Sequence, residues 1–297
     1  MSTPDSTQRD NTYFMDPESG AELARLINLD RLTTRCMGGL FSEQSTADLA
    51  TVHRLLDIGC GPGGWVQEIA YAYPKMEAVG IDISQTMIEY AHAQAQVQRL
   101  DNAHFQVMDA TQPLNFPDHS FDLVNARFIG FFPKAVWPLL LQECLRITRP
   151  GGIIRLTEIE IGICGITNSP ALEQLNALGT RALHLSGHGF SPDGRNMGTT
   201  PLLARFLRDA GYQNIQQRAH VMDYSAGAEA YEGIYQNNMV AFKLIQPFLV
   251  QVGVTTQEEV DRLYEPMLVE MRSEDFCGLA YLLTVWGKKP QGVRGKS

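Results

Sequence analysis

The sequence lacks clustered basic residues, which limits the partners that the protein can attract. Its 24 basic side chains are outnumbered by 33 acidic ones, giving a formal net charge of −9. The basic residues that do group together are confined to the C-terminal tail, at Lys288, Lys289, Arg294 and Lys296. Because an acidic chain gains little from phosphate backbones or anionic lipid, we expect neither nucleic acid nor a membrane surface as a partner.

Long apolar runs and paired cysteines are also missing. No apolar stretch reaches the length that spans a bilayer, and the first twenty residues contain no apolar core of a signal peptide. The cysteines are odd in number and form no C-x-x-C pair, so neither a disulfide framework nor a zinc site is predicted. They are Cys36, Cys60, Cys144, Cys164 and Cys277. These absences predict a cytoplasmic protein with reduced thiols.

What the sequence does contain is an alternation of short apolar runs with amphipathic helical patterns. An apolar content of 44% in 297 residues is enough to build a sizeable core. The runs that we interpret as strands cover residues 53–59, 77–84, 104–110, 121–128, 153–160, 214–225 and 278–289. Nearly continuous apolar strands alternating with helices indicate a parallel sheet covered on both faces. We therefore predict an α/β fold with a doubly wound, mostly parallel, seven-stranded sheet.

The helical segments outside this alternation predict how the chain is divided. We expect a flexible N-terminus at 1–12, a helical lid arm at 13–45, a core at 46–160, a helical insertion at 161–200, continued core at 201–224, a second helical insertion forming a substrate cap at 225–275, and a last strand and tail at 276–297. Helical spacing of apolar residues supports the arm, which should end at the pair Gly38-Gly39, where a helix C-cap would lie. Residues 149–152 are expected to form a turn before the fifth strand.

The stretch LLDIGCGPGGW, residues 55–65, predicts a ligand site. A glycine-rich loop after the first strand of a parallel sheet lies at the carboxyl edge, where ligands bind, and its glycines let a ligand approach the main chain. The predicted cradle is Gly59, Cys60, Gly61, Pro62 and Gly63. The spacing G-x-G-x-G differs from the dinucleotide fingerprint, although Gly64 leaves a dinucleotide possible on spacing alone.

Polar residues after the neighbouring strands narrow the choice of ligand. Asp57 precedes the loop, Asp82 ends the second strand, Asp109 follows the third, and Asn125 lies in the fourth. This set resembles the class I S-adenosylmethionine-dependent methyltransferases, in particular the small-molecule enzymes similar to those of ubiquinone and menaquinone biosynthesis. The resemblance is close over residues 52–157. It implies S-adenosylmethionine (SAM) as the cofactor.

The resemblance also implies roles for individual residues around the nucleoside. A carboxylate at the position of Asp82 can accept both ribose hydroxyls, as the equivalent acid does in dinucleotide folds. Asp109 corresponds to the residue that binds the adenine amino group, and the main-chain amide of Ala110 would meet a ring nitrogen. Ile83 and Met87 would enclose the purine.

Other residues are expected around the methionine part of the cofactor. The N-terminus of the first helix favours its carboxylate, and Asp57 complements its ammonium group. Asn125 would close over this part, and Arg127 would face either the cofactor or the substrate entrance. The candidates from the lid arm are Tyr13, Met37 and Gly38.

Methyl transfer from an activated sulfonium is an in-line displacement that needs a base only for a protonated acceptor. Candidate bases are Glu158, Glu160, His184, His188 and Tyr224. We rank Glu158 first as base or orienting group and His184 second, with no dedicated base as the third option. His184 and His188 are spaced i, i+4, but without a nearby helical carboxylate we expect no metal site.

Aromatic residues near the expected entrance suit a small apolar or aromatic metabolite as methyl acceptor, although such residues also serve plain core packing. They are Phe128, Phe131, Phe132 and Trp137 after the fourth strand, and Tyr224, Tyr231, Tyr235 and Phe242 after the sixth. We expect a monomer or homodimer. Two other functions stay open on this fold, a SAM-binding cyclase or rearrangement catalyst and a nicotinamide-dependent oxidoreductase.

Overall fold

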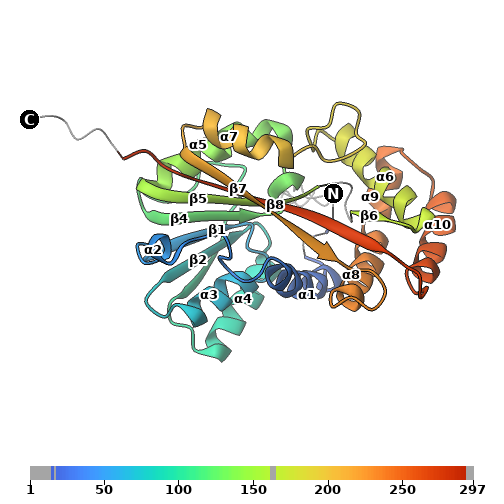
Figure 1. Cartoon of the computed structure of the whole chain (residues 1–297), viewed down its shortest axis with the longest axis horizontal. Helices are drawn as coiled ribbons and strands as arrows, with labels where there is room; N and C mark the ends of the chain where they lie inside the picture. Colours follow the sequence, from blue (N-terminus) through green and yellow to red (C-terminus); the bar gives the residue numbers. More distant parts are fainter. Residues whose placement is uncertain (1–14, 17, 161–164, 292–297) are drawn as a thin grey trace, which may run out of the picture.

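A mixed sheet forms the centre of the computed structural model, which describes residues 15–16, 18–160 and 165–291. Within these residues the sheet has eight strands in the order β3-β2-β1-β4-β5-β8-β6, and β7 pairs with β8 (Figure 1). The strands are β1 Arg54–Ile58, β2 Glu77–Asp82, β3 Ala103–Val107, β4 Phe121–Arg127, β5 Thr148–Glu160, β6 Ile166–Thr167, β7 Gln213–Asp223 and β8 Gly278–Lys288. The predicted doubly wound, mostly parallel α/β sheet is confirmed.

The parallel part of the sheet sets the register on which the site depends. Strands β1 to β5 pair in parallel, whereas β8 runs antiparallel to β5, β6 and β7. Asp57 of β1 lies opposite Asn125 of β4, and Asn125 lies opposite Arg155 of β5. Because side chains of paired residues share one face of a sheet, these three polar side chains are neighbours across three strands.

Helices cover both faces of this sheet. The helices are α1 Gly20–Cys36, α2 Thr46–Leu49, α3 Gly64–Ala72, α4 Gln85–Gln98, α5 Trp137–Ile147, α6 Pro170–Leu185, α7 Leu203–Asp209, α8 Tyr231–Leu244, α9 Gln246–Val252 and α10 Gln257–Glu270, with short 3-10 turns at Ile129–Phe131, Lys134–Val136 and Thr200–Leu202. Buried residues of α3 and α4 pack with one set of strand side chains, and those of α5 and α7 pack with the other. Alternate residues of each strand therefore contribute side chains to two separate core layers, one on each face of the sheet.

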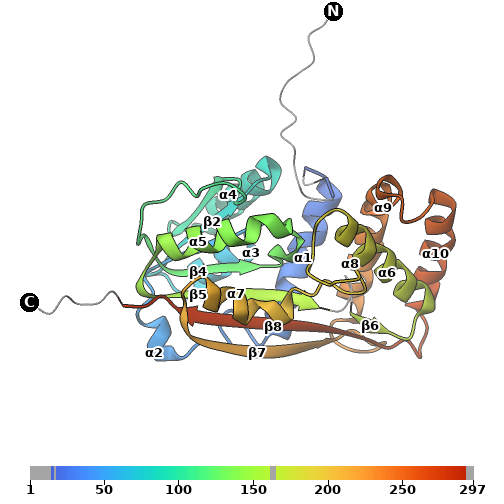
Figure 2. The same ribbon diagram turned by 90° about the horizontal axis from the view of Figure 1, so that it is seen from above.

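A third cluster gathers the helices that interrupt the second half of the chain. Buried side chains of α6, α8, α9 and α10 pack together with the first residues of β8. Figures 1 and 2 both show these helices grouped beyond the carboxyl ends of the parallel strands. The arm helix α1 packs against α8 and α3 at the same end. None of the helices in the described ranges has both the length and the apolar character needed to cross a membrane.

Two local features differ from the sequence-based prediction. The two-residue strand β6 was not predicted, because a segment this short has no recognisable alternation. Strand β5 begins at Thr148, so the expected turn at 149–152 belongs to the strand as an irregular segment. Its pairing with β4 shifts register between Phe121 and Leu123, and Gly151 has a φ of +79°, which is typical of a bulge that glycine accommodates.

Candidate functional site

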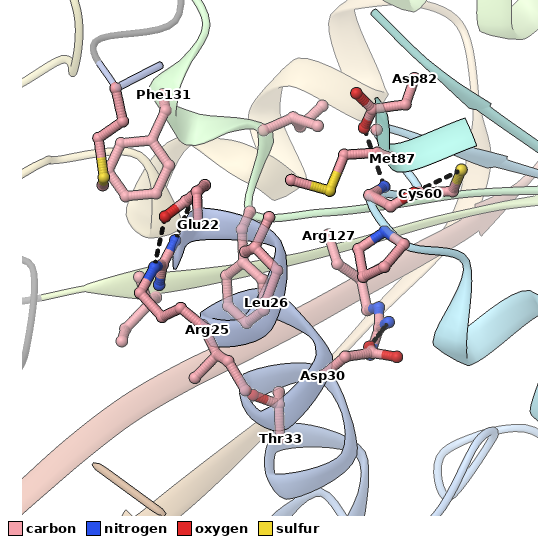
Figure 3. Close-up of a pocket in the computed structure, with 18 of the residues that line it drawn as sticks. Glu22, Arg25, Leu26, Asp30, Thr33, Cys60, Asp82, Met87, Arg127 and Phe131 are labelled. Atoms are coloured by element: carbon pink, nitrogen blue, oxygen red, sulfur yellow. Dashed lines mark hydrogen bonds and ion pairs between the residues drawn. The ribbon is translucent and has the colours of Figure 1, made fainter. Parts of the chain in front are cut away.

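A cavity of about 250 Å³ opens at the carboxyl ends of the parallel strands (Figure 3). One wall is formed by loops after β1, β2, β3 and β4, a second by α1, and a third by α8 together with β7 and β8. Segments from the core, the N-terminal arm and the second helical insertion therefore meet around one space. This position matches the edge at which open α/β sheets bind their ligands.

The glycine loop forms the floor of the first wall. Gly59, Cys60, Gly61 and Pro62 line the cavity. Gly61 has a φ of +52°, and the nearest atom to a side chain added there would be a methyl carbon of Leu26 at 3.8 Å. A larger residue at Gly61 would thus extend into the cavity and adopt a strained backbone conformation.

Asp82 lies beside this loop at the end of β2. Its Oδ2 accepts the main-chain N–H of Gly61 at 2.9 Å, and its Oδ1 accepts that of Ser84 at 3.0 Å. Burial raises the pKa of Asp82, while the main-chain N–H groups that point at the carboxylate oppose this shift. The carboxylate thus joins the glycine loop to the start of α4, where Ser84 caps the helix by accepting the N–H of Met87.

The residues expected around a purine lie next to Asp82. Ile83, Met87, Asp109 and Ala110 all line the cavity. The Oδ1 atom of Asp109 accepts the N–H and the hydroxyl of Thr111 at 2.9 and 2.7 Å. Asp109 therefore stabilises the turn after β3 while its side chain borders the cavity.

Asp57 lines the cavity and is also the first member of a buried chain of hydrogen bonds. Figure 3 shows its neighbours Arg127 and Cys60. Asn125 donates to Asp57 Oδ1 at 2.6 Å, Arg155 donates to Asn125 Oδ1 at 2.8 Å, and Glu43 accepts from Arg155. Asn125 itself is fully buried and does not line the cavity. Burial raises the pKa of Asp57 to about 6, although Arg127 and the Asn125 hydrogen bond act in the opposite direction.

Helix α1 covers the glycine loop and is joined to β4 by charge. Arg127 ion-pairs with Asp30 and donates to the hydroxyl of Thr34 at 3.1 Å. The inward face of α1 lines the cavity with Glu22, Arg25, Leu26, Leu29, Asp30 and Thr33. Sequence reasoning missed the polar members of this face. A usable signal was that these polar residues recur at positions 22, 25, 30 and 33, on the same face of the helix as Leu26 and Leu29.

The third wall is mostly apolar. It contains Met222 and Tyr224 from the end of β7, Ile234 and Ala241 from α8, and Ala280 and Leu282 from β8. Phe128, Phe131 and Phe132, which follow β4, line the cavity as well. The exceptions to this apolar character are Asn237 and Asn238, and Arg25 of α1 donates to Asn237 Oδ1 at 2.8 Å.

Several residues predicted for the site do not line the cavity. Met37 is buried among α6, α8 and α10, and Gly38 follows the C-cap of α1 with a φ of +83°. Gly63 is the N-cap of α3, and a side chain there would meet Phe105 at 2.5 Å, so this glycine serves close packing. Tyr13 lies outside the described residues.

The predicted bases are placed away from the cavity, with the exception of Tyr224. Glu158 is 2% exposed and its Oε1 accepts the N–H of Gly130 at 2.9 Å. Burial raises the pKa of Glu158 to about 8. His184, near the end of α6, faces the 187–198 loop, since a side chain at Gly194 would touch its ring. A base role for Glu158 or His184 stays a prediction, and the structure places the Glu158 carboxylate behind the loop that lines the cavity.

The region that contains the first wall of the cavity is similar to known proteins. A model of the methyltransferase domain family matches residues 55–152. An uncharacterised methyltransferase of Bacillus subtilis, YcgJ, is 36% identical over 113 residues, covering 38% of this chain and 43% of that protein. A fatty-acid O-methyltransferase of Mycolicibacterium smegmatis is 30% identical over 149 residues, covering 49% of this chain and 50% of that protein. The chain thus spans about half the length of the curated relatives it matches.

A solved structure extends the likeness to most of the chain at the level of the fold. Phosphoethanolamine N-methyltransferase 2 of Haemonchus contortus, in complex with phosphomonomethylethanolamine and S-adenosylhomocysteine, superposes with a TM-score of 0.52. The alignment covers 94% of this chain and 60% of that chain, at 17% sequence identity. At this identity the similarity concerns the arrangement of the sheet and its helices.

Proposed function

We propose that the chain, whose residues 55–152 match the methyltransferase domain family, is a class I SAM-dependent methyltransferase that transfers a methyl group from SAM to a small, mainly apolar acceptor. One observation carries the proposal. The glycine loop and Asp82 share a single cavity with the mostly apolar wall formed by α8, β7 and β8. A cofactor wall and an acceptor wall around one space are what a transfer between two bound molecules requires.

The residues on the first wall fit the cofactor. The buried carboxylate of Asp82 can accept two ribose hydroxyls, and Gly61 leaves open space where a side chain would intrude. Asp57 supplies a second carboxylate for the ammonium group, and Asp109 and Ala110 border the space for the base. When bound, SAM supplies a methyl group already activated on a sulfonium centre.

The chain's own contribution is then alignment and exclusion of water. Helix α1 covers the glycine loop through Leu26 and through the Arg127–Asp30 ion pair. The apolar side chains of Met222, Tyr224 and others oppose it across the cavity. In such a desolvated space, proximity and orientation supply much of the acceleration of a displacement, so the proposal requires no base from Glu158 or His184.

The cysteines and the net charge of the chain bear on where the protein acts and on what it accepts as substrate. Cys36, Cys60, Cys144 and Cys277, the described cysteines, are free thiols, which supports a reducing compartment such as the cytoplasm. The net charge of −9 supports a small-molecule acceptor over nucleic acid or a lipid surface. We carry forward the expectation of a monomer or homodimer as part of this proposal.

A cofactor-based screen tests the function. The full chain is incubated with labelled SAM and a library of apolar carboxylic acids, phenols, alcohols and amines, and both labelled product and S-adenosylhomocysteine (SAH) are quantified. We expect SAH to form in equal amount to one methylated product. Binding of SAM without any SAH release across the library would count against transfer and in favour of a cyclase, and preferential binding of a nicotinamide cofactor would overturn the assignment altogether.

A further inference from the structure

A charged pair lies on the acceptor side of the cavity, where the surrounding wall is apolar. Glu22 and Arg25 both line the cavity, and their residues are 0% and 9% exposed. Arg25 donates to both carboxylate oxygens of Glu22, from Nε at 2.7 Å and from Nη2 at 2.5 Å. Figure 3 shows the pair beside Phe131 and apart from Asp82 and Cys60, with Leu26 between the two groups.

The pair continues into a polar row on the facing helix. Arg25 Nη1 donates to Asn237 Oδ1 at 2.8 Å, and Asn237 donates to Asn238 Oδ1 at 3.0 Å. Both asparagines also line the cavity. Helices α1 and α8 therefore bring a carboxylate, a guanidinium and two amides to one place in an otherwise apolar wall.

Such a cluster is costly to bury for packing alone. Two ions lose hydration when they are buried, and an apolar pair of the same size often serves stability as well or better. A cavity-facing polar cluster also acts on selectivity, because a ligand group that forms hydrogen bonds gains from contact with polar atoms and an apolar group does not. These two properties together favour a role in ligand selection.

From this arrangement, and resting on the proposed methyl transfer, we infer that Glu22, Arg25 and Asn237 form a specificity site for a neutral hydroxyl group on an otherwise apolar acceptor. A hydroxyl donates one hydrogen bond and accepts others, so it can accept from Arg25 or Asn237 and donate to the side-chain oxygen of Asn237, while Glu22 holds the guanidinium in place. The pair carries no net charge. An ionised carboxylate at the same place would be repelled by Glu22, and an ammonium group would be repelled by Arg25, in a region of low dielectric.

Three matched probes measure this selectivity in the full chain saturated with SAH. They are para-butylphenol, butylbenzene, which lacks the hydroxyl, and para-butylbenzoate, which replaces it with a charge. Ligand-observed NMR gives their affinities. We expect the phenol to bind about 10- to 100-fold more tightly than butylbenzene, the range that hydrogen bonds to charged groups provide, and more tightly than the benzoate.

The double variant Glu22→Leu/Arg25→Met replaces the pair with apolar side chains of similar size. We expect it to keep native SAH affinity and to lose the preference for the phenol. Arg25→Lys keeps the charge but not the two-pronged contact with Glu22, so it should reduce the preference in part. The matched control is Arg35→Met/Glu229→Leu, which removes the pair between Arg35 of α1 and Glu229, whose side chains are 69% and 74% exposed, and which should leave the preference unchanged.

The outcomes separate the specificity site from its alternatives. Equal affinity of the native chain for phenol and butylbenzene, or an unchanged preference in both pair variants, overturns the inference and leaves the pair as a link between α1 and α8. Tightest binding of the benzoate overturns the assignment to a neutral group. Failure of the native chain to bind SAH would instead contradict the proposed cofactor. That result is distinct, because the three probes report only on the acceptor side of the cavity.

Discussion

Asn125 donates a hydrogen bond of 2.6 Å to Asp57 from the adjacent strand, and this contact fixes a carboxylate at the cofactor side of the cavity. The amide is held in one orientation because Arg155 donates to its oxygen at 2.8 Å. The NH₂ group must therefore face Asp57. A side chain that never reaches the cavity thus determines the direction of one that does.

The first prediction concerns the pH dependence of cofactor binding. Burial raises the pKa of Asp57 to about 6 in the free protein, and an ammonium group placed beside the carboxylate would lower the pKa in the complex. The complex then holds fewer protons than the free protein as the pH falls through 6. We expect SAH affinity to be constant above about pH 7 and to fall by up to about tenfold per pH unit below 6. Calorimetric titrations between pH 5 and 8 measure it.

Asp57→Asn should weaken SAH binding at pH 7 and reduce this slope. Some slope will persist, because burial raises the pKa of Asp82 as well. Asp209→Asn, which alters an exposed carboxylate on α7, is the matched control and should behave as the native chain does. An identical slope in the native chain and in Asp57→Asn would show that Asp57 does not meet the ammonium group.

The second prediction tests Asp82 directly. Asp82→Ala removes the carboxylate proposed for the ribose and also its hydrogen bonds to the N–H groups of Gly61 and Ser84. Loss of charge-assisted hydrogen bonds of this kind costs about 1.5–3 kcal/mol, or roughly 10- to 150-fold in affinity. We expect SAH binding to weaken by that factor, measured by calorimetry. Glu77→Ala, at the opposite end of the same strand, should have no effect, and native affinity in Asp82→Ala would remove Asp82 from the site.

The sheet could be predicted from the sequence because its signals are local. Apolar runs such as 53–59 and 278–289 match β1 and β8 to within one residue at each end. The bulge at the start of β5 could not be predicted in this way, since it depends on how Phe121 and Leu123 pair with a neighbouring strand. The two-residue β6 is defined only by its pairing with β8.

The cofactor side of the cavity could also be predicted from local sequence signals. The acceptor side could not. Asp82 and Gly61 each lie at the end of a strand that the pattern identifies. Arg25 and Asn237 are more than two hundred residues apart and meet only through the packing of α1 on α8. The sequence does not distinguish the roles of Gly61 and Gly63. In the structure Gly61 lines the cavity, whereas Gly63, at the start of α3, packs in the core.

A third prediction concerns Glu158, whose pKa is raised to about 8 by burial. The folded state retains this proton more strongly than the unfolded chain, so the carboxylate lowers the free energy of unfolding as the pH rises from about 5 to 8. In Glu158→Gln the group no longer titrates. We expect the free energy of unfolding of the variant, minus that of the native chain, to increase by up to about 1.4 kcal/mol per pH unit in this window. Urea denaturation measures both values.

The same variant decides between a base and a positioning role. Glu158 holds the N–H of Gly130, whose neighbours Ile129 and Phe131 line the cavity, and an amide oxygen can accept that bond equally well. We therefore expect near-native turnover in Glu158→Gln, and also in His184→Ala. Glu173→Gln, an exposed change in the first turn of α6, is the control for both measurements. A loss of about 10²–10⁴-fold in turnover with intact SAH binding would establish general-base catalysis by the altered residue.

The last prediction concerns helix α1 as a cover over the cofactor. Arg127 of the core forms an ion pair with Asp30 and a hydrogen bond to Thr34 of this helix. Just before the helix, the carboxylate of Glu18 accepts the N–H groups of Gln85 and Thr86 at the start of α4. A ligand beneath α1 should stabilise its closed position, because covers of this kind close on the bound state. We expect SAH, and SAH with an acceptor still more, to slow amide hydrogen exchange in residues 20–36 and 231–244.

Asp30→Asn weakens the first of these contacts by removing its charge, and it should speed exchange in residues 20–36 of the ligand-free protein while leaving the strands unchanged. Arg127 would then lack its ionic partner, so SAH affinity should also fall. Glu229→Gln, which removes the partner of Arg35 on the exposed side of the same helix, should alter neither exchange nor affinity. If ligands give α1 and α8 no added protection, or if Asp30→Asn exchanges as the native chain does, then α1 is a fixed part of the cavity wall and no cover has to open for the cofactor to enter.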